Sequence, residues 1–299
     1  MTVGLFIPCY IDQFFPHVGV ATLELLERLD CEVVYPRDQT CCGQPMSNAG
    51  FMDEAEAAHR NFIEQFSGFD YVVAPSGSCV LHVREHVRAA EAAPHGSDSV
   101  DAAATHAGAD AGEADDDPGG RTYELCQFLI EVLQVDRVNA SFPHRVGLHA
   151  ACHGLRGLRL ASSSERQDPP FNYVAQLLGM VDGLELVELE RPDECCGFGG
   201  TFSVSEEAVS VRMGRDRVAD HVRSGAEVIV STDISCLMHM DGLIRREGRP
   251  VRVAHVAEIL NGTANAGRTE KGGEPGGTES GDAESGDTEP WGTKPGGTR

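Results

Sequence analysis

The chain has 299 residues and a formal net charge of -23 at pH 7. This length exceeds that of most single domains and allows a buried core in each of two domains. Arginine supplies nearly all of the positive charge, because the only lysines are Lys271 and Lys294. An acidic surface repels a phosphate backbone, which argues against nucleic acid as a partner. The composition is typical of a halophile protein, whose charges are screened by a salty cytoplasm; an ordinary acidic protein is the alternative.

Ten cysteines exceed what packing alone requires, yet the chain does not resemble a secreted disulfide scaffold. Its first residues, MTVGLFIPCYIDQFF, lack the basic start and the cleavage site of a signal peptide. No uninterrupted apolar run approaches the roughly 20 residues that a membrane-spanning helix needs. We therefore expect a protein of the reducing cytoplasm with no direct membrane span.

Two segments lack the apolar side chains that a core requires. Residues 90–121 form an acidic insertion, which between Ala90 and Gly120 holds eight acidic residues and no lysine or arginine. Residues 262–299 consist mainly of Gly, Thr, Glu and Pro in near-repeats. Neither composition can offset the conformational entropy lost on ordering, so we expect a disordered loop and a disordered C-terminal tail.

The rest of the sequence divides into two halves that resemble each other. VGLFIPCY at 3–10 matches VGLHAACH at 146–153, and each reads as a short apolar strand that ends in a cysteine. Each half continues with a helical pattern, a short strand, twin cysteines, a charged helix, an apolar strand and a closing helical segment. These segments are, in chain order, residues 16–30, 32–36, 41–42, 53–66, 70–79 and 122–133, and then 171–183, 184–189, 195–196, 206–222, 226–236 and 253–260.

Alternation of strand and helix predicts an α/β fold with parallel strands covered by helices. Because the pattern occurs twice, we expect two three-layer α/β domains related by a pseudo-twofold duplication. The first domain comprises residues 1–89, completed by 122–140, and the second comprises 141–261. The charged helices are expected to have solvated faces.

Eight of the ten cysteines come into register when the halves are aligned. We call them the first cysteine set (Cys9, Cys41, Cys42 and Cys79) and the second cysteine set (Cys152, Cys195, Cys196 and Cys236). The outer members of each set follow apparent strands, and in a parallel sheet that edge binds ligands because loops converge there and helix N-termini favour anions. We expect one metal site per half, formed by thiolates. Cys31 and Cys126 are unmatched and are expected to be buried apolar residues.

Adjacent cysteines can present two sulfurs to different irons of one cluster, and Gly43 and Gly197 then allow close backbone approach. Structural zinc sites use paired short spacings, whereas these thiols are spread over a whole half. The pattern therefore favours an iron–sulfur cluster, with a zinc-stabilised structural module as the alternative. Nearby histidines could hydrogen-bond a sulfur, replace a ligand or pack against the sheet; they are His82, His149, His153 and His239.

The duplicated Cys-Cys-Gly motif with its strand-end cysteines resembles the cysteine-rich CCG-domain family, over residues 3 to about 261. A chain of two such domains, with no ferredoxin-type cysteine run in front of them, is most similar to the lactate-utilisation subgroup of this family. It resembles more distantly the glycolate oxidase iron–sulfur subunit and the B subunit of heterodisulfide reductase. The resemblance implies iron–sulfur clusters of [4Fe-4S] type on the eight cysteines. It also implies an electron-transfer subunit of a complex that oxidises L-lactate or a related 2-hydroxy acid such as glycolate. Other subunits, including another redox protein, are the implied partners, and no catalytic residue is assigned.

This chain departs from the heterodisulfide reductase type in one motif, because it lacks the first cysteine of the Cys-x-x-Cys that this type carries. This chain has Ser76 before Cys79 and Asp233 before Cys236, so each half supplies four thiols. Ser76 and Asp233 could provide oxygen ligands, leave an iron open or merely shape the turn. A heterodisulfide-reductase-like thiol/disulfide redox subunit is the alternative function.

Overall fold

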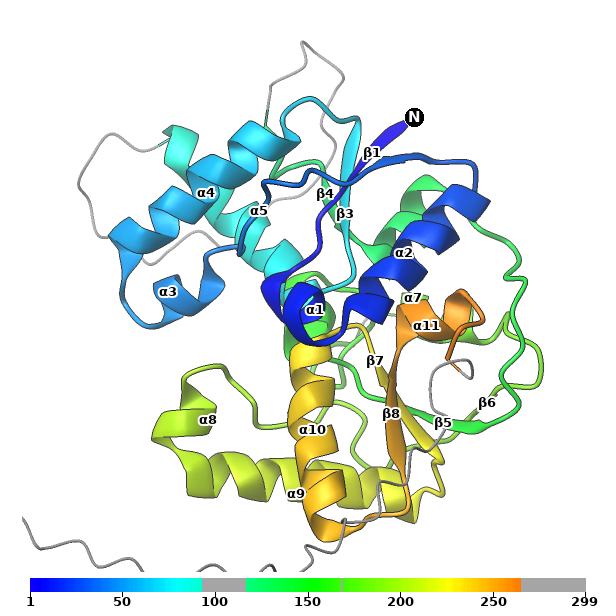
Figure 1. Ribbon diagram of the computed structural model, residues 1–299. Helices are drawn as coiled ribbons and strands as arrows, with labels where there is room; N and C mark the ends of the chain where they lie inside the picture. Colours follow the sequence, from blue (N-terminus) through cyan, green and yellow to red (C-terminus); the bar gives the residue numbers. More distant parts are fainter. Residues whose placement is uncertain (93–116, 168, 265–299) are drawn as a thin grey trace, which may run out of the picture. The chain divides into compact units, whose positions relative to one another are not determined.

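Two four-stranded parallel sheets form the framework of the computed structural model, which describes residues 1–92, 117–167 and 169–264 (Figure 1). The first sheet has the order β2-β1-β3-β4 and the second has the equivalent order β6-β5-β7-β8. Every pairing within them is parallel. The expected duplication of an α/β unit with parallel strands is therefore confirmed.

The first half carries strands and helices in alternation. Its strands are β1 (Thr2–Leu5), β2 (Glu32–Val34), β3 (Tyr71–Ala74) and β4 (Thr122–Glu124). Its helices are α1 (Cys9–Phe14), α2 (Pro16–Arg28), α3 (Gln44–Asn48), α4 (Met52–Phe66), α5 (Gly77–Ala92) and α6 (Leu125–Gln127), followed by the π-helix η1 (Phe128–Val132).

The second half repeats this order. Its strands are β5 (Arg145–Leu148), β6 (Glu185–Leu186), β7 (Val228–Ser231) and β8 (Arg252–His255). Its helical elements are the π-helix η2 (His153–Gly157), α7 (Tyr173–Leu178), α8 (Phe202–Ser205), α9 (Glu207–Arg223), α10 (Ile234–Glu247) and α11 (Val256–Leu260).

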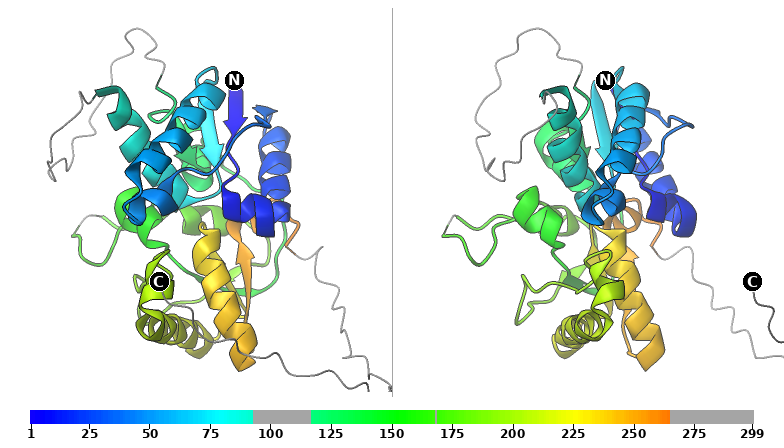
Figure 2. Two further views of the ribbon diagram at one scale, coloured as in Figure 1. Left: turned by 60° about the vertical axis from the view of Figure 1, so that its left-hand side comes forward. Right: turned by 90° about the vertical axis from the view of Figure 1, so that its left-hand side faces the viewer.

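Helices lie on both faces of each sheet, as a three-layer unit requires. On one face of the first sheet, Phe6 and Val72 pack with Phe62 of α4 and Val80 of α5. The other face belongs to a larger core that α2 shares with elements of the second half. There α2 contacts α11, and α7 contacts both α6 and α11 (Figures 1 and 2). The two halves are thus joined by one continuous apolar core.

Two segments that the sequence predicts as helical throughout begin as strands. Residues 122–133 start with β4 and residues 253–260 start within β8, so these predictions were wrong for their first residues. Runs of three or four apolar and β-branched residues carry no usable periodicity, and pairing with β3 and β7 decides their conformation. The long helices α5 and α10 were not anticipated.

The described fold extends into both segments that were expected to be disordered. Helix α5 reaches Ala92, and the Thr122 hydroxyl donates to the carbonyl of Pro118 at 2.7 Å in the turn before β4. After α11, the backbone N–H of Thr263 donates to the carbonyl of Glu258 at 2.9 Å. The remainder of the expected loop, 93–116, and of the expected tail, 265–299, lies outside the described residues.

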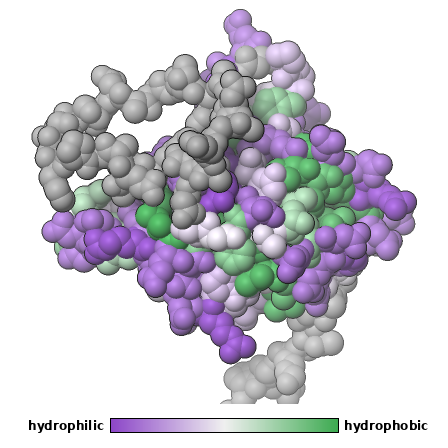
Figure 3. Space-filling model, turned by 90° about the horizontal axis from the view of Figure 1, so that it is seen from above, coloured by the Kyte–Doolittle hydropathy of each residue, from purple (hydrophilic) through white to green (hydrophobic). Residues whose placement is uncertain are grey.

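Viewed from above, much of the surface is hydrophilic and hydrophobic residues gather in separate patches (Figure 3). Among the described helices, none combines the length and apolar character needed to cross a membrane.

Candidate metal centres

The outer cysteines of both sets lie where a strand gives way to a helix. Cys9 is the first residue of α1, and Cys152 directly precedes η2. Cys79 and Cys236 are the third residues of α5 and α10. The expected strands therefore end earlier than predicted, at Leu5, Ala74, Leu148 and Ser231. The thiols still lie at the carboxyl edges of the sheets, and helix N-termini there favour thiolates.

A glycine in the left-handed region follows each pair of twin cysteines. Gly43 has φ 94° and Gly197 has φ 87°, a conformation that other L residues rarely adopt. A Cβ on Gly43 would lie 2.7 Å from His59 Nε2, and one on Gly197 would lie 2.6 Å from the carbonyl oxygen of Ser210. The glycine lets the twin cysteines turn tightly against the second helix after them, α4 or α9.

The first cysteine set is brought together in space. The Sγ atoms of Cys9 and Cys41 are 3.8 Å apart. Hydrogen bonds from Cys42 and Cys9 hold the pKa of the Cys41 thiol well below its ordinary value, whereas the hydrogen bond to Cys41 raises the pKa of Cys42. Cys42 also bonds Cys79, so contacts between sulfurs connect all four members.

The second cysteine set repeats this arrangement. Hydrogen bonds from Cys152 and Cys196 hold the pKa of the Cys195 thiol well below its ordinary value. The pKa of Cys196 is raised by its bonds to Cys195 and Cys236, which completes the chain of four sulfurs. In both halves, the first of the twin cysteines is the thiolate that its neighbours stabilise.

These two groups of thiols suit an iron–sulfur cluster. All ten cysteines are free, and the eight matched ones offer two sets of four soft sulfur donors. The unmatched Cys31 and Cys126 are buried within the apolar core. When bound, such a cluster would be held by the four thiolates of each half.

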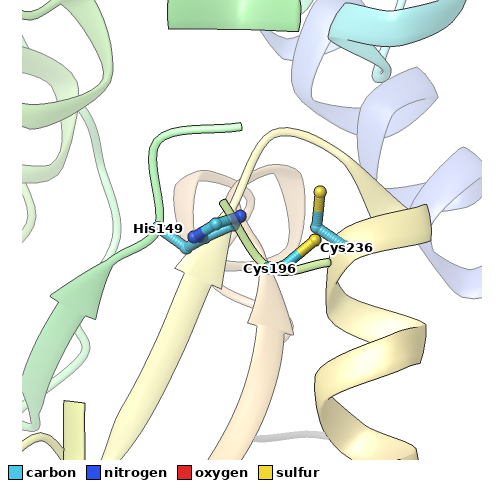
Figure 4. A group of neighbouring side chains, drawn as sticks. All are labelled: His149, Cys196 and Cys236. Carbon is cyan, nitrogen blue, oxygen red and sulfur yellow. The ribbon is translucent and has the colours of Figure 1, made fainter. Parts of the chain in front are cut away.

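His149 lies beside the second cysteine set. A ring nitrogen of His149 and the sulfurs of Cys196 and Cys236 lie within 4.8 Å of one another, and the ring extends toward Cys196 (Figure 4). Only 1% of the side chain is exposed, and Nδ1 accepts a hydrogen bond from Arg217 Nε at 3.1 Å. Burial and the Arg217 charge lower the pKa of His149 to about 3, so the ring is neutral at ordinary pH.

Arg217 is a site residue that sequence reasoning missed. The helix that contains it was expected to have a solvated face, yet Arg217, Asp220 and His221 are each 0% exposed. Arg217 Nη1 donates to the carbonyl of Arg191 at 2.5 Å and lies 3.3 Å from Asp220 Oδ2. The guanidinium thus ties the loop that leads into Cys195 to α9. The only sequence signal was the spacing of three polar residues on one helical face.

The other histidines near the cysteines have protein partners or lie at the surface. His82 Nε2 lies 3.0 Å from His59 Nε2, and burial lowers the pKa of His82 to about 3. His239 Nε2 lies 3.4 Å from the carbonyl oxygen of Ser210. His153 is exposed.

Ser76 and Asp233 are both buried and both bond the polypeptide. Ser76 Oγ accepts from the backbone N–H of Cys79 at 3.4 Å. Asp233 accepts from the backbone N–H of Ser78 at 2.8 Å and from the Ser235 hydroxyl at 2.9 Å. These contacts favour the interpretation that the two side chains shape the turns before α5 and α10.

Aromatic rings connect the surroundings of the two sets. Tyr10, which follows Cys9, meets Phe198 edge to face with ring centroids 6.2 Å apart. Phe198 lies two residues after Cys196 and is 6.2 Å from the His239 ring. Residues next to both sets therefore touch across the boundary between the halves.

Comparisons with known proteins agree with the duplicated motif. The family model of the cysteine-rich domain CCG matches residues 3–84 and 146–241. A protein named Lactate utilization protein A from Exiguobacterium sp. is 41% identical over 87% of this chain and 96% of its own length. Proteins of the same name from Geobacillus kaustophilus and Bacillus subtilis are 41% and 39% identical, each over 87% of this chain and 99% of their own length.

Proposed function

The chain belongs to the family of cysteine-rich CCG-domain proteins, and from that membership we propose that it is an iron–sulfur electron-transfer subunit of a complex that oxidises L-lactate or a related 2-hydroxy acid. The observation that carries the proposal is the pair of matched four-thiol sets. The names of its relatives supply the connection with lactate. The high net negative charge supports a salty cytoplasm as its setting.

Oxidation of L-lactate to pyruvate releases two electrons and two protons. An iron–sulfur cluster, when bound, passes one electron at a time, so a partner subunit with a two-electron cofactor must take the pair and release it in single steps. The thiolates of the two sets would hold the clusters, and the ring contact between Tyr10 and Phe198 joins the surroundings of the two sets. This chain then serves as a relay, and the alcohol is oxidised on the partner.

The first test is the metal content of protein purified without oxygen. We expect iron and acid-labile sulfide and no stoichiometric zinc. Zinc without sulfide would replace the proposal with a structural module.

The second test assigns the sites. The double variant Cys41→Ser/Cys42→Ser should lose about half of the iron, and Cys195→Ser/Cys196→Ser should lose the other half. Each variant should keep the spectroscopic signal of the surviving site. Circular dichroism must accompany the metal count, because ligand loss can unfold a domain. A folded double variant of either kind without any iron would contradict the two-site proposal.

A further inference from the structure

The hydrogen bond from Arg217 fixes which nitrogen of His149 carries its proton. An arginine Nε always bears hydrogen and has no acceptor capacity, so His149 Nδ1 must accept in the 3.1 Å contact. A neutral imidazole with an unprotonated Nδ1 carries its one proton on Nε2. Nε2 is buried and has no protein hydrogen-bond partner among the described residues.

This tautomer changes what His149 can do at the second cysteine set. A metal ligand must present a lone pair, whereas Nε2 presents an N–H group. Since Nδ1 is occupied by Arg217, Nε2 is the atom left to meet the sulfurs of Cys196 and Cys236 (Figure 4). We infer that His149 is a hydrogen-bond donor to the sulfurs of the second set rather than a metal ligand, and that this gives the second set the higher reduction potential. The inference rests on the proposed function, because it requires a cluster in each half.

The first half has no such donor at the equivalent position. Phe6 follows the Val-Gly-Leu sequence of β1, and His149 follows the same three residues at the end of β5. Phe6 meets Phe62 and Phe66 of α4 at ring centroid distances of 5.1 and 5.6 Å. His149 instead meets Arg217 and His221 of α9, which have the same four-residue spacing.

The two glycines confirm that these positions correspond. A Cβ added to Gly4 would collide with Phe66, and one added to Gly147 would collide with His221. An apolar trio in the first half is therefore replaced by a polar trio in the second. The second trio is His149, Arg217 and His221.

Replacing the apolar trio by the polar trio changes the reduction potential, because reduction adds negative charge to the cluster. Hydrogen bonds to cluster sulfurs stabilise that charge and raise the reduction potential, whereas a phenyl ring offers no donor. The positive charge of Arg217 is largely balanced by Asp220 at 3.3 Å, so the main difference is the N–H group. His82 and His239 each lie three residues after a site cysteine, so both halves have a histidine at this position. The Nε2 atoms of these two histidines face His59 and the carbonyl oxygen of Ser210, respectively.

The experiment measures the midpoint potentials of the full, iron-loaded chain by redox titration with electron paramagnetic resonance. His149→Phe gives the second half the side chain of the first, and His149→Gln keeps an N–H donor of similar reach. His144→Phe, a partly exposed histidine beside Glu227, is the matched control. Each substitution is also placed in the background Cys41→Ser/Cys42→Ser, which leaves only the second set.

We expect His149→Phe to lower one of the two midpoint potentials by at least about 59 mV. For a one-electron couple, this shift corresponds to a tenfold change in the reduction equilibrium constant. The shift should persist in the background with only the second set, and both His149→Gln and His144→Phe should leave the potentials near the parent values. An unchanged potential in iron-loaded His149→Phe would overturn the inference alone. A parent protein without iron would overturn the proposed function and the inference together.

A measurement on the unsubstituted protein decides between donor and ligand even if His149→Phe fails to fold. With 15N-labelled histidine, a donor gives only weak hyperfine coupling to the reduced cluster, which is the expected result. Strong coupling of a directly bound nitrogen that is absent from His149→Gln would show that His149 ligates iron and would overturn the assignment.

Discussion

The carboxylate of Asp233 accepts a hydrogen bond from the backbone N–H of Ser78 at 2.8 Å, and this bond joins the start of α10 in the second half to the start of α5 in the first. The start of α5 also lies close to η2 of the second half, since a Cβ on Gly77 would lie 3.3 Å from the backbone nitrogen of Gly154. Asp233 and Ser78 are both buried. The bond therefore fixes the relative positions of two helices that carry site cysteines in their first turns.

Removing this carboxylate should loosen the contact between the halves without removing a metal ligand. Asp233→Ala leaves the buried N–H of Ser78 without an acceptor, and we expect the free energy of unfolding to fall by about 1 to 3 kcal/mol. Asp233→Asn keeps an acceptor and should cost less. Chemical denaturation and iron content are measured together, with Asp216→Ala in an exposed ion pair as control. Loss of iron at unchanged stability would instead identify Asp233 as a ligand.

The stability cost of an alanine at Gly197, which follows the twin cysteines, can be compared with the cost of one at Gly200. Gly197 and Gly200 both have positive φ, at 87° and 62°, but only Gly197 is crowded. A Cβ there would lie 2.6 Å from the carbonyl of Ser210, whereas nothing lies within 4 Å of one on Gly200. Gly200→Ala should cost about 1 to 2 kcal/mol for backbone strain. Gly197→Ala should cost roughly 1 to 3 kcal/mol more for overpacking, as measured by urea denaturation. Equal losses would mean that the close approach is unimportant.

Much of the architecture could be predicted because the same order of strand, helix and cysteine motifs occurs in both halves of the sequence. Matching VGLFIPCY with VGLHAACH placed eight cysteines in register, and the structure brings each set of four together. The strands β4 and β8 were missed because three or four residues carry no periodic signal, and pairing with β3 and β7 decides their conformation.

The polar trio around His149 could not be predicted for a different reason. Charged residues on a helix usually face water, and the spacing of Arg217, Asp220 and His221 indicates only a shared face. Their burial depends on contacts with the loop at Arg191 and Pro192 and with the end of β5, all distant in sequence. Tertiary contacts of this kind are not visible in a local pattern.

Salt should stabilise this protein if its acidic surface is an adaptation to high salt. With a net charge of -23, repulsion between surface carboxylates is strong in dilute buffer and is screened within about 3 Å at 1 M salt. We expect the free energy of unfolding to rise between 0.1 and roughly 3 M KCl, because the higher salt concentration screens the repulsion between surface carboxylates more strongly. A triple glutamine variant at the exposed Glu185, Glu188 and Glu190 should depend less on salt. Greatest stability in dilute buffer would contradict the halophile interpretation.

Glu124 should make stability fall as the pH rises. Its side chain is 0% exposed, where Oε2 accepts a hydrogen bond from the backbone N–H of Gln127 at 3.1 Å. Burial raises the pKa of this carboxyl from an ordinary value of 4.5 to about 8 in the folded protein. The fold therefore favours the protonated form, and its contribution is fully present below pH 4.5 and is lost as the pH rises through 8.

The variant Glu124→Gln tests this dependence, because glutamine keeps the acceptor for Gln127 and cannot ionise. We expect the free energy of unfolding of the parent to fall by roughly 4 kcal/mol between about pH 5 and pH 9 through this group. In Glu124→Gln that part of the fall should vanish, so the variant should match the parent at pH 5 and exceed it at pH 9. Urea denaturation at fixed KCl measures both, with the exposed Glu32→Gln as control. If the variant loses stability with pH as steeply as the parent, Glu124 is not the group whose ionisation causes the fall.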